Sequence, residues 1–288
     1  MYNDRRSFLT AVFEDTQKQI ETNEQLAVLT EQGRRGTRFY GAGHPSNLRK
    51  QPDTEPNVAV TKARTFEAAV KMKKGHPDWR VGVLNFASAT NPGGGVKNGS
   101  SAQEECLCRC SNLYPMLNQK WLWDMYYLKN RAENNALHTD DCIYCPGVTI
   151  FKSDIEYPLM LLPEEWTRVD VISCAAPNLR EKPGNRYNPE AAERVEISAK
   201  ELYDIHLRRG KRILDVAAKN KIDAMVLGAF GCGAFMNDPA VVAEAWRDVV
   251  AERGGYFKYL EFAVFCRPYD TTNYDVFRAT IKPNTHGR

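Results

Sequence analysis

The sequence lacks the long apolar runs that membrane helices need, since no stretch of about 18 consecutive apolar residues occurs in it. Its first ten residues, MYNDRRSFLT, also lack the apolar core of a secretory signal peptide. Neither sign of charge is in clear excess, because 39 Lys and Arg face 36 Asp and Glu and leave a net charge of +3. Binding to nucleic acid through a general basic surface is therefore not indicated. We expect a soluble cytoplasmic protein without a membrane or a sequence-specific nucleic-acid partner.

Cysteine is too sparse for a disulfide scaffold, with eight residues spread over 288 positions. The thiolates of Cys106, Cys110, Cys142 and Cys145 could in principle hold zinc. The last two form a CxxC inside a predicted strand, however, where residues three apart face opposite sides. Ordinary reduced thiols are the favoured interpretation, and we expect no metal.

The five histidines also give no metal-binding pattern such as HExxH. We interpret each as a surface residue or a hydrogen-bonded structural residue; they are His44, His76, His138, His206 and His286.

From residue 57 onward, short apolar runs alternate with helical stretches. The runs predict strands at 57–61, 80–86, 142–151, 168–175, 224–227 and 259–266. Helices are predicted at 65–74, 102–117, 118–137, 189–220 with a break near Gly210, and 239–253. This alternation predicts an α/β fold with helices on both faces of the sheet. In such folds ligands bind beyond the carboxyl ends of the strands.

The first 56 residues do not show this alternation of strands and helices. Apolar residues at helical spacing predict an amphipathic helix over residues 4–24. Residues 31–56 are polar and rich in Gly, Pro, Arg and Asn, which predicts a long surface connection. We therefore expect a helical appendage and connection over residues 1–56 and the main domain over residues 57–288.

Two other groups of residues have a simple structural interpretation. The arginines at 34–35 and 208–212 are expected on the solvated surface, in preference to a track for an anionic polymer. The aromatic run over residues 121–127, WLWDMYY, is expected to pack within the protein in preference to stacking on bases.

A glycine-rich loop follows the predicted strand 80–86. It contains Gly93, Gly94 and Gly95, which have no Cβ atoms and can take positive φ angles. Such a loop can present N–H groups to an anion or a sugar. The alternative is a tight surface turn.

Next along the chain come Gln103, Glu104 and Glu105, at the start of a predicted helix. Ser101 and Glu104 fit a capping box, which is a purely structural role. Adjacent helical residues point about 100° apart, so the two glutamates cannot do the same job. One can cap or bind while the other points into a cleft.

A second glycine loop, GAFGCGAF over residues 228–235, follows the predicted strand 224–227. Asp238 is a suitable N-cap for the next helix, and Pro239 suits its first position. A strand, a glycine loop and a helix start together favour binding of phosphate through backbone N–H groups. The loop is neither a Walker loop nor a dinucleotide fingerprint.

Together these motifs resemble the bacterial-type poly(ADP-ribose) glycohydrolases, whose catalytic domain is macrodomain-like with a mixed sheet. The resemblance rests on LNFASATNPGGG, on QEE after seven intervening residues, and on GAFGCGAF. It covers roughly residues 57–280, and the helical N-terminal segment resembles the appendage of these enzymes.

The resemblance implies hydrolysis of the ribose–ribose O-glycosidic bonds of poly(ADP-ribose), with release of ADP-ribose and without a cofactor or metal. Glu105 would be the catalytic acid and Glu104 would hold the ribose hydroxyls. The implied substrate-binding residues are Ser88, Asn91, Gly93, Gly94, Gly95, Val96, Gln103, Gly231, Cys232, Gly233, Ala234, Phe235 and, against the adenine, Tyr269. The implied partner is an ADP-ribose polymer or an ADP-ribosylated protein.

The chemistry needs an acid for the leaving oxygen. A single glutamate could protonate the departing ribose hydroxyl and then deprotonate water. A helix N-terminus favours ionised carboxylates, whereas a general acid must hold a proton. We therefore expect bound diphosphate and loss of water to favour protonation of Glu105. Two alternatives stay open: a hydrolase of single ADP-ribose marks on protein or nucleic acid, and a non-catalytic ADP-ribose reader.

Overall fold

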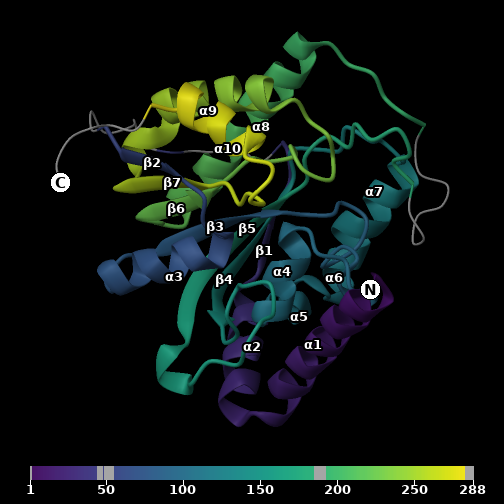
Figure 1. The fold of residues 1–288 in the computed structure, drawn as a ribbon, viewed down its shortest axis with the longest axis vertical. Coiled ribbons are helices and arrows are strands. Elements are labelled where there is room, and N and C mark those ends of the chain that lie inside the picture. Colours follow the sequence, from purple (N-terminus) through teal and green to yellow (C-terminus); the bar gives the residue numbers. More distant parts are fainter. Residues whose placement is uncertain (1, 44–47, 49–54, 185–192, 283–288) are drawn as a thin grey trace.

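The chain folds around one seven-stranded mixed sheet (Figure 1). The computed structural model describes residues 2–43, 48, 55–184 and 193–282, and His44 and His286 lie outside them. The strands are β1 (Arg38–Tyr40), β2 (Asn57–Thr61), β3 (Val81–Phe86), β4 (Cys142–Ile150), β5 (Thr167–Cys174), β6 (Ala224–Leu227) and β7 (Tyr259–Ala263). Their order in the sheet is β1-β4-β5-β3-β6-β7-β2. The five strands from β5 to β2 run parallel, and β4 is antiparallel to both β5 and β1.

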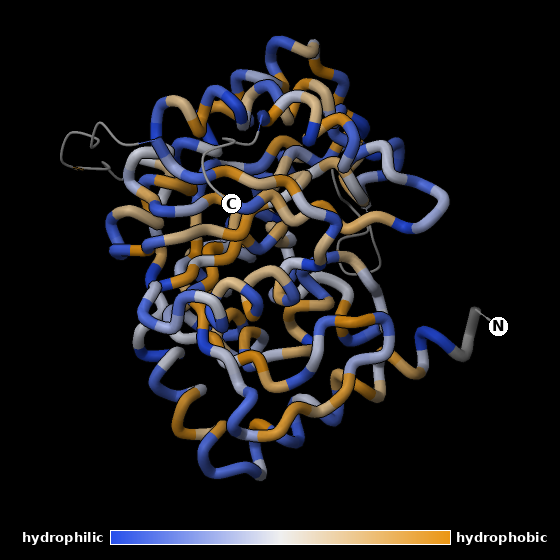
Figure 2. Tube along the Cα trace, turned by 60° about the vertical axis from the view of Figure 1, so that its left-hand side comes forward, coloured by the Kyte–Doolittle hydropathy of each residue, from blue (hydrophilic) through white to orange (hydrophobic). Residues whose placement is uncertain are grey.

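Helices cover both faces of this sheet, as the alternating pattern predicts. On one side lie α8 (Ala199–Lys219), α9 (Pro239–Arg253) and α10 (Thr272–Thr280). The other side carries α1 (Tyr2–Thr22), α2 (Glu24–Gly36), α3 (Thr65–Gly75), α4 (Gln103–Cys110), α5 (Leu113–Leu117), α6 (Lys120–Leu122) and α7 (Leu128–Glu133). A π-helical turn, Trp123–Tyr127, joins α6 to α7. In Figure 2 the apolar segments gather in the central strands, and most outer turns are hydrophilic.

The sheet separates two apolar cores, and the CxxC of β4 contributes to both. Cys145 packs in the core beneath α3 and α4, whereas Cys142 packs in the core beneath α8 and α9. This follows from the alternation of side chains along a strand. The four thiolates considered for zinc are therefore not assembled, and within the described ranges no group of three or more His, Cys, Asp or Glu could hold a metal.

The N-terminal segment is more closely integrated than a surface connection would be. The expectation for residues 31–56 is wrong for its first part, because α2 continues to Gly36 and β1 forms the edge of the sheet beside β4. In α1, the hydroxyl of Thr16 donates to the carbonyl of Arg109 over 2.6 Å, and Asp15 pairs with Lys152 at 2.6 Å. These contacts fix α1 against α4 and against the segment that follows β4. The domain boundary at residue 56 stays a prediction.

Three further expectations need correction. The predicted helix 102–117 is two helices, because Ser111 pairs with Ile150 and Asn112 accepts from the N–H of Thr149 over 2.7 Å. Helix α8 starts at Ala199 and runs straight through Gly210, which is glycine because a Cβ there would lie 2.7 Å from Val249 of α9. The stretch 189–192 of that prediction lies outside the described residues.

The expected packing of the aromatic run is confirmed, since Tyr126 and Tyr127 are buried. The expectation for the arginines holds for Arg35, which is exposed, but is wrong for Arg209 and Arg212, which are buried. No helix in the part of the chain that the structure describes is long and apolar enough to span a bilayer.

Candidate active site

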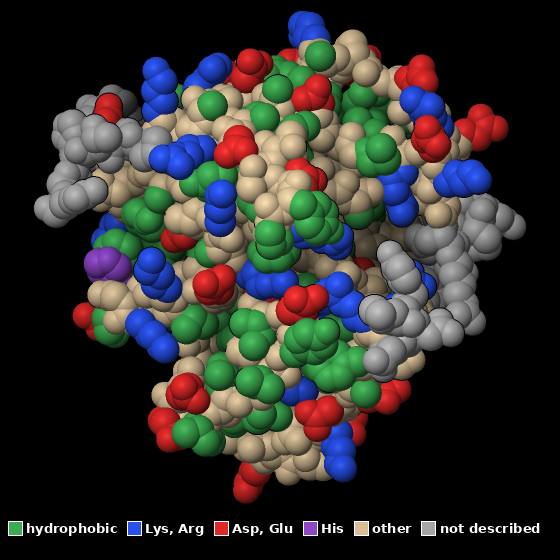
Figure 3. Space-filling view, viewed as in Figure 1, with side chains coloured by type: hydrophobic (Ala, Val, Ile, Leu, Met, Phe, Trp, Pro, Cys, Tyr) green, Lys and Arg blue, Asp and Glu red, His purple; other side chains and the backbone are tan. Residues whose placement is uncertain are grey.

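A cleft of about 1370 Å³ lies at the carboxyl ends of the parallel strands. The loops after β3, β5, β6 and β7 all contribute to its walls, as expected for an α/β sheet. The start of α4 closes it with Glu104 and Glu105. Figure 3 shows this face hollowed near its middle, with Lys and Arg side chains beside the hollow. Both motifs identified in the sequence therefore meet in one cavity.

The carboxylate of Glu104 is a structural centre of the loop after β3. Its Oε2 accepts from the N–H of Ser88 over 2.7 Å, and its Oε1 accepts from the N–H of Gly93 and from the side chain of Asn85, both at 3.3 Å. The residue is 3% exposed. The predicted capping box is wrong, because the N-cap of α4 is Ala102 and no side chain caps it. Glu104 instead bonds the end of β3 and the loop that follows it.

Glu105 is held by one oxygen only. Its Oε1 accepts from the N–H of Gly95 over 2.9 Å, and its buried Oε2 has no hydrogen-bond partner among the described residues. The two carboxylates converge below Gly94, whose missing Cβ would lie 2.6 Å from Oε1 of Glu105 and 3.2 Å from Oε2 of Glu104. Glycine is required here both for space and for its φ angle of 55°.

This crowding and the burial of Glu104 disfavour the charged form of Glu104 near neutral pH. Burial, followed by the charge of Glu105, raises the pKa of Glu104 to about 8, against the effect of its three donors. Both oxygens of Glu104 already accept from N–H groups, whereas Oε2 of Glu105 is unpartnered. The carboxylate oxygen left free for a ligand in this pair is therefore Oε2 of Glu105.

The pH dependence of stability tests this retained proton. The raised pKa means that the proton's contribution to stability is fully present below pH 4.5 and is lost as the pH rises through about 8. Glu104→Gln removes the carboxyl group that has the raised pKa. We expect the melting temperature of this variant, relative to the wild-type chain, to rise by several degrees between pH 5 and pH 8. A difference that stays constant over this range would contradict the raised pKa of Glu104.

Two residues predicted to bind substrate, Gln103 and Val96, make structural contacts within the protein. The amide of Gln103 donates to the carbonyl of Leu84 and the hydroxyl of Thr65 and accepts from the N–H of Phe86. It therefore fixes the start of α4 to the end of β3. The side chain of Val96 is buried in the core, and its N–H donates to the carbonyl of Gly93. Val96 thus supports the loop from below.

The sequence suggests that both glycine loops present N–H groups to a ligand, but the two loops differ in which of these groups are already hydrogen-bonded. In the first loop, the N–H groups of Gly93, Gly94 and Gly95 are already used by Glu104, by the carbonyl of Asn91 and by Glu105. In the second loop, the described residues accept no hydrogen bond from the N–H groups of Gly231, Gly233, Ala234 and Phe235. The second loop is therefore the one whose free N–H groups can accommodate an anion, and it lies next to the start of α9, where Asp238 is the N-cap and Pro239 begins the helix.

The remaining predicted residues surround the glutamates. Ser88 and Asn91 line the cleft. The side-chain Oδ1 of Asn91 accepts from the guanidinium of Arg131, which also donates to the backbone oxygen of Thr90 over 2.9 Å. Tyr269 lines the cleft beyond β7 and is 77% exposed. The side chain of Cys232, by contrast, packs partly against the core below α9.

Sequence reasoning missed several residues of this site. Asn85 interrupts the apolar run of β3, and that interruption was its only signal. Arg131, His138 and Arg180 come from segments without a motif, yet all lie at the cleft or bind its loop. His206 fits the structural interpretation, since its ring bonds Asn237 over 2.7 Å.

Comparison with known proteins decides the family. The model of the microbial-type PARG (poly(ADP-ribose) glycohydrolase) catalytic domain matches residues 10–153, which include the first glycine loop and both glutamates. The chain belongs to the microbial-type poly(ADP-ribose) glycohydrolase family. No match was found among curated proteins.

Solved bacterial poly(ADP-ribose) glycohydrolases share the whole fold. The enzyme from Thermomonospora curvata is 29% identical with a TM-score of 0.80, over 96% of this chain and 100% of its own. That from Deinococcus radiodurans, solved in complex with ADP-ribose, is 34% identical with a TM-score of 0.73, over 88% of this chain and 96% of its own. The second glycine loop lies outside residues 10–153, the segment that the family model matches. The structural similarity to the two solved enzymes, however, covers 96% and 88% of this chain.

Proposed function

We propose that this protein hydrolyses the ribose–ribose O-glycosidic bonds of poly(ADP-ribose) and releases ADP-ribose, with Glu105 as general acid and base. The observation that carries the proposal is the unpartnered Oε2 of Glu105, which lies beside Glu104, a carboxylate whose two oxygens both accept hydrogen bonds. Membership of the glycohydrolase family supports the reaction, and the complex of the Deinococcus enzyme with ADP-ribose supports the ligand.

The ligand would lie across both loops. The free N–H groups of Gly231, Gly233, Ala234 and Phe235 would bind the diphosphate. Phe235 would also hold the reacting ribose beside the glutamates. Ser88 and Asn91 would line the ribose from the other wall, with Gly94 allowing its close approach. Tyr269 would stack on the adenine at the β7 end of the cleft.

In the reaction, the proton on Oε2 of Glu105 passes to the 2′ oxygen of the leaving ribose as its bond to C1″ breaks. The anionic diphosphate, bound close by, stabilises the positive charge that develops on the sugar. The carboxylate of Glu105 then takes a proton from water, whose oxygen bonds to C1″. The products are ADP-ribose and a polymer shortened by one unit.

Product analysis on two substrates tests this function. We expect the wild-type protein to release ADP-ribose from purified poly(ADP-ribose) chains. Release only from a mono-ADP-ribosylated protein would instead assign a hydrolase of single marks. Binding of ADP-ribose without release from either substrate would assign a non-catalytic reader.

A further inference from the structure

The cleft has two ends on opposite sides of the catalytic glutamates. The sheet order β5-β3-β6-β7 places the loop after β3, with Gly94 and the glutamates, between the loop after β5 and the loop after β7. In the proposed function the adenine of the bound unit occupies the β7 end. The β5 end therefore faces the part of the substrate beyond the bond that breaks.

The wall at the β5 end consists of residues 135–138 and 176–183. Backbone hydrogen bonds tie it together, since the N–H of Asn178 donates to Ala136 O over 2.8 Å and that of Leu179 donates to Phe235 O over 3.0 Å. Phe235 thus belongs both to the diphosphate loop and to this wall. Any group in this wall that contacts Phe235 lies beside the reacting ribose.

Two side chains of the wall meet Phe235. The guanidinium carbon of Arg180 lies 5.7 Å from the centre of the Phe235 ring, and the His138 ring lies 6.2 Å from it. Arg180 donates only to the Asn178 side chain at 3.0 Å and to Pro183 O at 2.9 Å, and no carboxylate pairs with it within the described residues. Its guanidinium retains further N–H donors that suit a phosphate.

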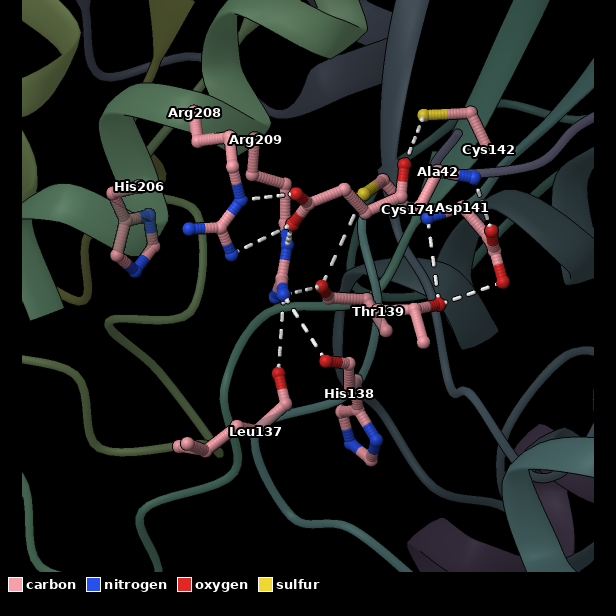
Figure 4. Close-up of polar contacts among 12 residues, drawn as sticks. Ala42, Leu137, His138, Thr139, Asp141, Cys142, Cys174, His206, Arg208 and Arg209 are labelled. Atoms are coloured by element: carbon pink, nitrogen blue, oxygen red, sulfur yellow. Dashed lines mark hydrogen bonds and ion pairs between the residues drawn. The ribbon is translucent and has the colours of Figure 1, made fainter. Parts of the chain in front are cut away.

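His138 is held rigidly as a neutral hydrogen-bonding group. Arg209, 1% exposed, donates to Leu137 O at 3.1 Å, to His138 O at 3.5 Å and to Ala175 O at 2.7 Å. Figure 4 shows the His138 ring pointing away from this guanidinium. Burial and Arg209 lower the pKa of His138 to about 4, and its Nδ1 has no hydrogen-bond partner in the described part of the chain.

From this placement we infer that Arg180 and His138 form a subsite for the leaving ADP-ribose unit of the polymer. Arg180 binds its diphosphate and His138 bonds one of its sugar hydroxyls. This inference rests on the proposed function, because it requires a polymer as substrate. A charged hydrogen bond of this kind is worth about 10- to 100-fold in binding.

Arg180→Met tests the subsite, because it keeps much of the side-chain length and removes the charge. We expect kcat/KM on poly(ADP-ribose) to fall about tenfold or more. Hydrolysis of an ADP-ribose that carries p-nitrophenol on C1″ should stay within about twofold, since this leaving group has no phosphate, and so should the Kd of free ADP-ribose. Arg180→Lys should recover part of the loss on polymer.

Controls separate the possible failures. Arg247→Met removes an arginine that pairs with Asp248 on α9, away from the cleft, and should leave both activities unchanged. An equal loss on both substrates in Arg180→Met, or no loss on either, would overturn the subsite. A loss confined to mono-ADP-ribosylated protein would overturn it too, in favour of a protein acceptor. If the wild-type protein releases nothing from polymer, the proposed function itself fails.

Discussion

Glu105→Gln is expected to lower the turnover of poly(ADP-ribose) by about 100- to 10,000-fold, the range that a general acid and base contributes. The amide keeps the size of the side chain, and its oxygen can still accept from the N–H of Gly95. It cannot transfer a proton from the position of the free Oε2. Binding of ADP-ribose should therefore persist with a Kd within a few-fold of the wild-type value, measured by titration calorimetry.

The matched control is Glu244→Gln, which makes the same change on the exposed face of α9. Its turnover should equal that of the wild-type protein. If Glu105→Gln retained near-full turnover, Glu105 would not be the acid. If the variant also lost ADP-ribose binding, the carboxylate would have a binding role that the geometry does not assign to it.

Gly94→Ala should be nearly as damaging, although it removes no chemical group. A Cβ at this position would lie 2.6 Å from Oε1 of Glu105, and the φ angle of 55° is unfavourable for alanine by about 1–2 kcal/mol. The carboxylates must shift to make room, and a displacement of about 1 Å can lower a rate about 100-fold. We expect kcat/KM on polymer to fall by at least that factor.

Gly75→Ala provides the comparison for Gly94→Ala. A Cβ at Gly75, the last residue of α3, would meet nothing within 4 Å. Activity and melting temperature should remain close to wild type. A Gly94→Ala enzyme with activity within about threefold of wild type would show that the two carboxylates are not confined as described.

The sequence predicts the sheet well because its strands are buried and apolar. The run 224–227 and the helix 239–253 match the structure residue for residue, since the N-cap Asp238 and Pro239 mark the helix start locally. β1 could not be predicted, because it has only three residues and is a strand only through its pairing with β4. The break between α4 and α5 likewise depends on a contact of Asn112 with β4, about 40 residues away along the chain.

The residues of the site could be predicted from the sequence where they belong to a local motif. The two glutamates and the glycine loops follow from local spacing, but the partners of each carboxylate do not. The capping role that Ser101 and Glu104 suggest fails because Glu104 accepts from three donors on β3 and the loop after it. Arg180 and His138 carry no local signal, since only the fold brings them to Phe235.

A crystal structure of Glu105→Gln with ADP-ribose tests the central claim most directly. We expect the diphosphate to accept hydrogen bonds from the free N–H groups of the second glycine loop, those of Gly231, Gly233, Ala234 and Phe235. The C1″ hydroxyl of the distal ribose should lie within hydrogen-bond distance, about 3 Å, of the side chain at position 105. A distal ribose that points out of the cleft, or a diphosphate bound away from the second glycine loop, would contradict the account.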